Sequence, residues 1–514
     1  SESRYTDFDA VGHLLEYQQV TDNHTFTSSY QYNLAGTLTQ ETYPSGRVVH
    51  NTFDANVDLS VVESKPDTNS SFSTYADSFT YNAGGAVTRM RLGNNLWETA
   101  QFNTRLQTTQ LALGTTETAA DIWKTDYQYG EVQTNGTVDM TKNNGNIGKQ
   151  TLTVPGTDFV QAYKYDSLNR LTEAKETTGT TQNWIQQFGY DRYGNRTSFS
   201  QTVGNATTNT TPGINANTNR FSTGQGFTYD SNGNVTGDID LQTGHARSFA
   251  FNGDNKQTLV TDTSVNHVVG QYLYGSNGER VKKITDAGAT VFVYSAGKLI
   301  EEYSGTTLQK SYIYAGSRLL ATEDANGTSY LTEDHLGSPR VITNEQGQVT
   351  SRRDFMPFGE ELYSGIGGRS SNINYGPPAD DLRQKFTGYE RDNEINLDFT
   401  EARMYNFQHG RFTSTDPIIM SFDRAVDPQR INLYAYSRNN PLRYIDPDGE
   451  DILEPTGLSE EDQKAYEKWK AAYLATEAGR KTWDRYQNDK NFKLKIAVAD
   501  RGSDSKNRSA KVDD

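Results

Sequence analysis

Pairs of aromatic residues separated by one other residue recur along most of the chain, and most pairs lead into a polar turn. Residues i and i+2 of a strand lie on one face. Asp or Asn followed by Gly favours a positive-φ turn that reverses the chain. The pattern therefore predicts antiparallel β-hairpins with one aromatic face. The pairs are Tyr30/Tyr32, Phe79/Tyr81, Tyr163/Tyr165, Phe188/Tyr190, Phe227/Tyr229, Phe249/Phe251, Tyr272/Tyr274, Phe292/Tyr294 and Tyr312/Tyr314.

The spacing of these pairs indicates a repeat array. From Tyr165 onward the second aromatic of each pair follows the previous one at short, similar intervals, except for one longer interval between Tyr190 and Tyr229. A unit of this size cannot bury an aromatic face alone, so it must stack on its neighbours. We expect residues 1–330 to form one continuous wound sheet. The tyrosines expected to align in neighbouring strands are Tyr165, Tyr190, Tyr229, Tyr274, Tyr294 and Tyr314.

Composition supports an all-β protein without a single compact aliphatic core. The chain has 31 Tyr and 22 Phe, but only 33% of its residues are hydrophobic. Ordinary globular domains are about 45–50% apolar when Gly is included. A tyrosine ring supplies buried area while its hydroxyl can stay in water. Aromatic residues repeated on a strand period also argue against disorder.

Charge and residue usage exclude several classes of function. The formal net charge of −16 makes nucleic acid a poor partner, since phosphate binding needs a basic face. No run of 18 apolar residues occurs, so we expect no transmembrane segment. The absence of cysteine excludes disulfides and thiol catalysis. The seven histidines show no metal-ligand spacing, and we expect neither a metal nor a cofactor.

From about residue 330 the repeat gives way to shorter, more closely spaced motifs. Each is weak alone, but together and in this order they resemble the Rhs-repeat-associated core of YD-repeat (Rhs) proteins. The motifs are Asp334-His-Leu-Gly-Ser-Pro-Arg340, Phe355-Met-Pro-Phe-Gly-Glu360, Lys385-Phe-Thr-Gly-Tyr-Glu390, Leu397-Asp-Phe399, Ala402-Arg-Met-Tyr405, Gly410-Arg-Phe-Thr-Ser-Thr-Asp-Pro417, Asn432-Leu-Tyr-Ala-Tyr436, Asn439-Asn-Pro-Leu442 and Asp446-Pro-Asp-Gly449.

The resemblance implies a hollow shell, like those of bacterial polymorphic toxins, the BC component of Tc toxins and teneurins. In this family a spiral of YD-repeat hairpins forms the wall, and the core plugs one end. A variable C-terminal segment, often a toxin, follows. We accordingly expect a YD-repeat β-shell over 1–330, the core over 331–449 and a variable segment over 450–514. The alternative is a solid β-solenoid or propeller with the same repeat.

The core is expected to be the most closely packed part of the chain. Its motifs carry large aromatic residues at high density, which suits a plug that closes an end of the sheet. The aromatic residues expected to be buried are Phe386, Tyr389, Phe399, Tyr405, Phe412, Tyr434 and Tyr436.

The resemblance also implies a candidate aspartyl self-cleaving site. Such a site needs two carboxylates close together, one that acts as a base on water and one that acts as an acid. Asp416 and Asp446, each followed by Pro, match the two Asp-Pro landmarks of the core. Arg438 could hold a carboxylate ionised or orient the carbonyl that is cut. The alternative is that both aspartates are turn residues, because Asp-Pro commonly opens turns.

One departure from the family pattern bears on this activity. The cleaved form of the motif is Asp-Pro-x-Gly-Leu, with the cut after Leu, whereas this chain has Glu450 in place of that Leu. A carboxylate is costly where an apolar side chain would be held in a pocket. We therefore expect the chain to remain largely uncut between residues 449 and 458.

The segment 450–514 differs in character from the rest of the chain. Ser459 followed by acidic residues predicts a helix start, and alternation over 492–498 predicts a strand with one apolar face. The end from Arg501 has a disordered composition. This small α+β tail contains no His and no Cys, so no catalytic site is evident in it.

Three functions stay open from the sequence. The first is the structural shell of an exported Rhs-type effector, secreted or on the cell surface. Its partners would be its own C-terminal segment or toxin and secretion machinery. The second is an adhesive surface protein, since exposed Tyr, Asn and Gln suit contacts with surface glycans. The third is an enzyme, either the aspartyl autoprotease that releases the C-terminal segment or a toxin with a catalytic part beyond residue 514.

Overall fold

The computed structural model describes residues 1–376, 382–417 and 428–450. The chain divides into two units. The larger comprises Ser1–Thr80 and Val87–Pro455, and the smaller comprises the turn Tyr81–Ala86 and Thr456–Asp514. The helix and strand expected after residue 459 lie outside the described residues. Nearly all of the described residues belong to the larger unit.

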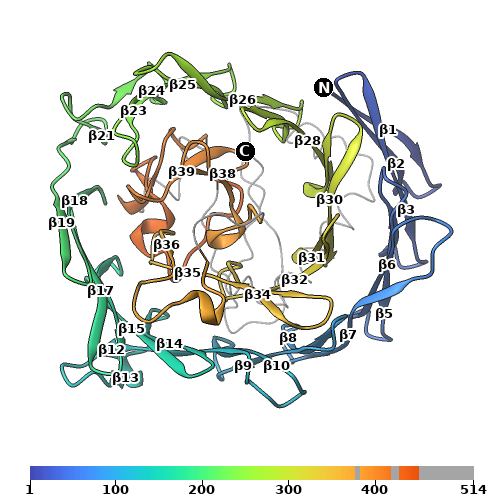
Figure 1. The fold of residues 1–514 in the computed structure, drawn as a ribbon, viewed down its shortest axis with the longest axis horizontal. Coiled ribbons are helices and arrows are strands. Elements are labelled where there is room, and N and C mark those ends of the chain that lie inside the picture. Colours follow the sequence, from blue (N-terminus) through green and yellow to red (C-terminus); the bar gives the residue numbers. More distant parts are fainter. Residues whose placement is uncertain (377–381, 418–427, 451–514) are drawn as a thin grey trace, which may run out of the picture. The chain divides into compact units, whose positions relative to one another are not determined.

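Antiparallel hairpins dominate the described residues, and strands pair with their neighbours in sequence (Figure 1). The first large sheet has 17 strands. They are β1 (Glu2–Phe8), β2 (Leu14–Thr21), β3 (His24–Tyr32), β4 (Leu38–Thr42), β5 (Val48–Phe53), β6 (Leu59–Lys65), β7 (Ser73–Tyr81), β8 (Val87–Leu92), β9 (Trp97–Phe102), β10 (Thr108–Gly114), β11 (Trp123–Tyr129), β14 (Ile147–Val154), β15 (Thr157–Tyr165), β16 (Leu171–Thr178), β17 (Thr181–Tyr190), β18 (Arg196–Val203) and β19 (Ala206–Thr210).

A second large sheet of 13 strands follows. It runs without interruption past residue 330, where the sequence motifs become denser. Its strands are β22 (Thr228–Tyr229), β23 (Val235–Ile239), β24 (Ala246–Phe251), β25 (Gln257–Asp262), β26 (His267–Tyr274), β27 (Arg280–Thr285), β28 (Gly288–Ser295), β29 (Lys298–Ser304), β30 (Thr307–Ala315), β31 (Arg318–Asp324), β32 (Gly327–Glu333), β33 (Pro339–Asn344) and β34 (Val349–Arg352).

The expectation of one continuous sheet over 1–330 is wrong at residues 211–227. Here only β20 (Ile214–Asn215) pairs with β21 (Arg220–Phe221). Pro212 lacks a ladder donor, and Gly213, Gly224 and Gly226 weaken strand formation. The interruption coincides with the long interval between the repeat tyrosines Tyr190 and Tyr229. A second small insertion pairs β12 (Glu131–Val132) with β13 (Val138–Asp139).

The repeated tyrosines form a hydrogen-bonded ladder across successive hairpins. The hydroxyl of Tyr165 donates to the carbonyl of Ile147 at 2.9 Å. Ile147 lies opposite Tyr129, which closes a further aromatic pair, Tyr127/Tyr129, in the preceding hairpin. Tyr229 departs from this arrangement, since its hydroxyl accepts from the N–H of Phe221. The predicted alignment is confirmed for the other tyrosines. The further ladder contacts are Tyr129–Thr108, Tyr190–Leu171, Tyr274–Gln257, Tyr294–Arg280 and Tyr314–Leu299.

An Asp or Asn directly after a strand organises many of the turns, although Tyr274, Tyr294 and Tyr314 are followed by Gly, Ser and Ala. Asp166 accepts from the backbone N–H groups of Leu168 and Arg170 through one oxygen, at 2.9 and 3.0 Å. A short side-chain acceptor of this kind satisfies turn donors that no strand partner reaches. The same contact pattern occurs at Asp9, Asn33, Asp54, Asn103, Asp191, Asn252, Asp334 and Asn344.

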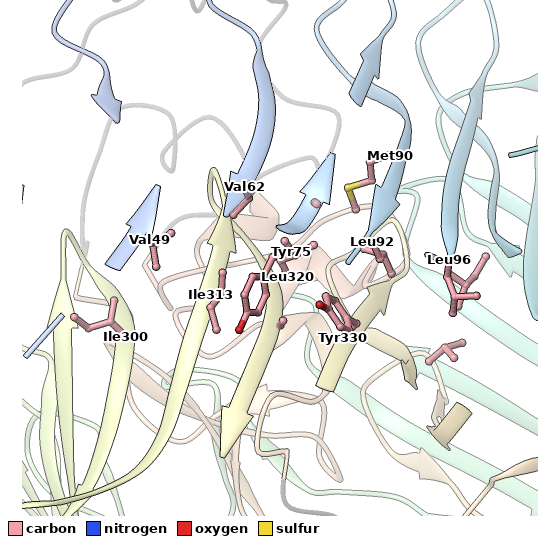
Figure 2. Close-up of a cluster of buried hydrophobic side chains, with 14 of the residues drawn as sticks. Val49, Val62, Tyr75, Met90, Leu92, Leu96, Ile300, Ile313, Leu320 and Tyr330 are labelled. Carbon is pink, nitrogen blue, oxygen red and sulfur yellow. The ribbon is translucent and has the colours of Figure 1, made fainter. Parts of the chain in front are cut away.

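The second sheet packs against the first, so part of the wall has two layers. Figure 1 shows β28–β34 inside the arc of β1–β10. The side-chain amide of Gln19 donates to the backbone carbonyl of Phe292 at 2.7 Å. The hydroxyl of Tyr43 donates to the backbone carbonyl of Tyr312 at 2.8 Å. A buried cluster lies between the layers (Figure 2). Its labelled members from both sheets are Val49, Val62, Tyr75, Met90, Leu92, Leu96, Ile300, Ile313, Leu320 and Tyr330.

The segment after β34 forms short elements. They are β35 (Asp354–Phe355), β36 (Glu361–Leu362), β37 (Glu390–Asp392), β38 (Leu397–Thr400), β39 (Arg403–Asn406) and β40 (Arg411–Phe412), with 3-10 turns at Ser371–Ile373, Phe386–Gly388, Pro428–Arg430 and Ser437–Asn439. A further 3-10 turn, Met140–Lys142, lies between β13 and β14. The seven aromatic residues predicted to be buried here are each at most 5% exposed. That burial prediction is confirmed.

Candidate functional site

Asp416 and Asp446, well separated in sequence, come together in the fold. Each places a carboxylate oxygen near the same nitrogen, Nη2 of Arg403, at 3.3 Å for Asp416 and 3.0 Å for Asp446. Both aspartates are buried, and Asp446 is only 1% exposed. The backbone N–H of Asp416 donates to the carbonyl of Leu433 at 3.0 Å, which fixes its position.

Arg403, at the start of β39, is the centre of the site. Its Nε donates to the carbonyl oxygen of Gly449, and its Nη1 donates to that of Leu433 at 3.1 Å. The guanidinium carbon lies 3.5 Å from the centre of the Phe412 ring. The planar guanidinium therefore uses several donors at once, as only arginine can.

The chain around Gly449 is held against β38 and β39. The hydroxyl of Tyr389 donates to the carbonyl of Asp446, and the N–H of Ala402 donates to that of Asp448 at 2.9 Å. Gly449 has φ +74°, and a Cβ there would lie 2.4 Å from the hydroxyl oxygen of Thr400. Only glycine satisfies both requirements. The chain therefore reaches residue 450 from a fixed point.

Arg438 lies in a strained turn. Ser437, Arg438 and Asn439 have φ values of 45°, 53° and 57°, three successive left-handed residues. The guanidinium of Arg438 lies 5.5 Å from the centre of the Tyr444 ring. The role suggested for Arg438 stays a prediction. The sequence did not predict a role for Arg403, although this residue lies in the Ala402–Tyr405 motif.

The chemistry of this cluster is that of a clamp. The guanidinium of Arg403 contacts both carboxylates and holds them together by charge. An aspartyl dyad instead needs one carboxyl protonated and a water held between the two. Arg403 also polarises the Gly449 carbonyl, one residue before the bond expected to be cut. The geometry thus anchors the chain at Gly449.

Other buried ion pairs join the core segment to the wall. Arg369, fully buried, donates to both oxygens of Glu176 in β16 at 2.7 and 2.8 Å, and its Nε donates to Asp354 at 2.7 Å. Burial would raise the pKa of Asp392, but Arg280 and Lys283 overcome this and hold that pKa at about 2. The contacts of Arg369 with Glu176 and of Asp392 with its two cations connect residues far apart in the sequence.

Three carboxyl groups in less favourable surroundings titrate near neutrality. Burial raises the pKa of Glu360 to about 7 and that of Glu333 to about 8, even though Arg196 and Arg318 respectively oppose the shift. Burial also raises the pKa of Glu401 to about 7, helped by the charge of Asp448. These groups make stability depend on pH.

A search of the described residues finds no group of three His, Cys, Asp or Glu side chains placed to hold a metal ion. No helix within those residues is long and apolar enough to cross a membrane.

Comparisons with known proteins agree with the resemblance. A family profile described as "Teneurin YD-shell" matches residues 78–442, and one described as "RHS Repeat" matches residues 8–48. The tRNA3(Ser)-specific nuclease WapA of Bacillus spizizenii is 26% identical over 294 residues, covering 55% of this chain and 12% of that protein. Toxin subunit YenC1 of Yersinia entomophaga is 23% identical over 309 residues, covering 57% and 29%.

Solved structures show the same fold. A crystal structure of TcdB2-TccC3 with Cdc42 superposes with a TM-score of 0.67 at 18% identity, covering 87% of this chain and 24% of that one. TcdB2-TccC3 without its hypervariable C-terminal region gives a TM-score of 0.69. The chain therefore spans a minor part of each of these relatives.

Proposed function

This chain belongs to the teneurin YD-shell family, and from that premise we propose that it is the shell of an exported effector and encloses its own residues 450–514. The β-spiral and the Rhs-type relatives support this proposal. The relatives include toxins and nucleases, of which the chain spans only a small part.

The anchoring of the chain at Gly449 carries the proposal. Arg403, Tyr389 and the β38–β39 turn hold residues 446–449 against the core segment. Buried pairs such as Arg369–Glu176 attach that segment to the wall. A segment that starts from such an anchored point is tethered to the fold. The shell would thereby retain this segment until delivery.

Limited proteolysis tests this proposal. Trypsin has several sites in the tail, including Lys464, Lys468 and Lys470. We expect these bonds to be cut far more slowly in the intact chain than in a synthetic peptide of residues 450–514. Exposed wall bonds serve as the internal control for protease activity. Equal cutting of the tail in both forms would contradict enclosure.

Aspartyl self-cleavage is a second candidate, favoured by the meeting of Asp416 and Asp446 on one nitrogen. In this reaction one carboxylate takes a proton from water as the water oxygen attacks the carbonyl carbon. The other carboxyl protonates the amide nitrogen that leaves. Glu450 adds a negative charge beside the expected cut and opposes the attack. The unmodified chain should therefore stay largely uncut between residues 449 and 458.

Intact mass measured after prolonged incubation decides between a clamp and an enzyme. Glu450→Leu should increase cutting if the two carboxylates are competent, and Glu450→Leu combined with Asp446→Asn should abolish that increase. A thermal melt of each variant separates lost chemistry from lost folding. If Glu450→Leu remains uncut while folded, the aspartates are structural only. Efficient cutting of the unmodified chain would show that Glu450 does not protect it.

A further inference from the structure

A cavity of about 260 Å³ lies where the first sheet ends, and the proposed shell function does not account for it. Residues of β18 and β19 form one side, and residues 408–411 and 432–439 of the core segment form the other. Leu241, which is 59% exposed, stands at its rim. Arg403, Asp416 and Asp446 are not part of its lining. The cavity is thus separate from the candidate site.

Arg196 gives this cavity a positive charge, and among the residues that the structure describes its guanidinium forms no ion pair with an Asp or Glu. Its guanidinium carbon lies 4.8, 5.4 and 4.3 Å from the centres of the Phe188, Phe199 and Phe358 rings. Its Nε and Nη2 are buried, and within the described residues they have no hydrogen-bond partner. Buried charged donors without an acceptor are costly. The three rings offset part of this cost, and an anion in the cavity would stabilise the guanidinium further.

The position of the guanidinium is built into the fold. Gly410 has φ +62°, and a Cβ at this residue would lie 2.1 Å from Nη2 of Arg196 and 2.9 Å from Cδ1 of Phe358. Any other residue at 410 would displace the guanidinium. The three rings and this glycine therefore hold the fork of Arg196 in place before anything binds.

The remaining charges leave the cavity positive at neutral pH. Arg411 donates to the carbonyl of Asn219 at 2.6 Å and lies on the rings of Phe221 and Tyr434. Burial, with Arg196 and Arg411 nearby, lowers the pKa of His409 to about 4, so this imidazole is neutral. Glu360 is the acidic residue in the lining, and its carboxyl, with a pKa of about 7, is about half protonated at neutral pH.

We propose that this cavity binds a monocarboxylate with a small apolar body. The carboxylate would pair with the guanidinium of Arg196, which belongs to the lining of the cavity. The body would lie against Phe199, Phe221 and Leu241. The volume of about 260 Å³ lies just below the ligand-pocket range of about 300–1,000 Å³, which suits a small ligand. The carboxylate can belong to a free organic acid or to an acidic residue of a peptide.

Calorimetric titration of the full chain with phenylacetate tests the proposal, with phenylacetamide as the uncharged probe of the same shape. We expect saturable binding of phenylacetate with one site per chain, and binding of the amide at least about tenfold weaker. Hexanoate and N-acetylphenylalanine extend the test to other bodies. Failure of all three acids to bind, or equal binding of acid and amide, would overturn the proposal.

Variants assign the binding to this cavity. Arg196→Gln should weaken phenylacetate binding at least about tenfold, whereas Arg192→Gln, an exposed arginine of the same hairpin turn, should leave it unchanged. If Arg196→Gln fails to fold, Leu241→Trp at the exposed rim should weaken binding by obstructing entry. Unchanged affinity in a folded Arg196→Gln protein, or in Leu241→Trp, would place the binding elsewhere and overturn the proposal.

A further titration with a peptide identifies whether the carboxylate comes from a polypeptide or from a free organic acid. An acetylated, amidated tripeptide with a central Glu presents a side-chain carboxylate without free termini. Tighter binding of this peptide than of phenylacetate would support a polypeptide occupant. Binding of phenylacetate alone would support a small organic acid.

Discussion

The repeat wall (residues 1–330) and the core segment (residues 331–449) are both β structures rich in buried aromatic residues, yet their key contacts span very different lengths of chain. In the wall, the Tyr165 hydroxyl bonds to a carbonyl 18 residues earlier. In the core segment, Arg369 bonds to Glu176, 193 residues earlier. The tyrosine ladder of the wall therefore joins neighbouring hairpins, and contacts such as Gln19 to Phe292 join its two layers, whereas the buried ion pairs of the core segment tie that segment to distant hairpins.

Removal of a cross-link should have the largest effect. Arg369→Met leaves the buried carboxylates of Glu176 and Asp354 without their shared cation. Breaking a buried pair from one side typically costs about 3–5 kcal/mol. We expect a loss of this size, or failure to fold, in chemical denaturation. Arg91→Met removes a more exposed pair with Asp77 and should cost at most about 1 kcal/mol. Similar losses in both variants would erase the distinction between the two regions.

Truncation of a core aromatic should come next. Phe412 and Tyr434 are 1% and 2% exposed, and removing a large buried side chain costs about 3–5 kcal/mol. Phe412→Ala and Tyr434→Ala should therefore melt at clearly lower temperature than the unmodified chain. Phe8→Ala, at a wall residue that is 52% exposed, is the matched control and should change little. Unchanged melting of both core variants would mean that this segment does not stabilise the fold.

The pH dependence of stability separates the regions further. The folded-state pKa values of Glu333, Glu360 and Glu401 lie above the ordinary value of 4.5, because burial favours the protonated forms. The folded chain thus binds more protons than the unfolded chain between about pH 4.5 and 8. Their contribution is fully present below about pH 4.5 and is lost as pH rises through about 7–8.

Thermal melts from about pH 5.5 to 8.5 measure this effect, which should amount to a few degrees. Glu360→Gln should flatten the part of the profile below about pH 7. Glu131→Gln, at an exposed residue of β12, should leave the profile as it is. A profile that is unaffected by Glu360→Gln would show that this carboxyl is ionised in the fold.

Loss of a single ladder contact in the wall should have the smallest effect. Tyr165→Phe removes the hydroxyl that donates to Ile147 and keeps the ring, at a cost of about 0.5–1.5 kcal/mol. Tyr5→Phe, at a residue that is 59% exposed, should be neutral in the same denaturation experiment. A loss as large as that of Arg369→Met would mean that a single ladder contact stabilises the fold as much as a buried cross-link of the core segment.

The same difference explains what the sequence predicted. Hairpins, turn residues and the tyrosine ladder depend on neighbours in sequence, so the spacing of Tyr165 and Tyr190 sufficed to predict them. In the sequence, only the long interval between Tyr190 and Tyr229 indicated the interruption of the sheet at residues 211–227. The partners of Arg369 and Arg403 are 193 and 43 residues away, and no local pattern specifies such pairs. The meeting of Asp416 and Asp446 was suggested by family landmarks, while the arginine between them was missed.

Labelling of single cysteines tests most directly whether the wall and core enclose the tail. The chain has no cysteine, so Ser459→Cys in the tail and Asp286→Cys at an exposed wall turn each provide one thiol. The reagent is a polyethylene-glycol maleimide too large to pass between paired strands. The account predicts rapid modification of Asp286→Cys, slow modification of Ser459→Cys, and equal rates for both in denaturant. Equally rapid modification of Ser459→Cys in the folded chain would contradict it.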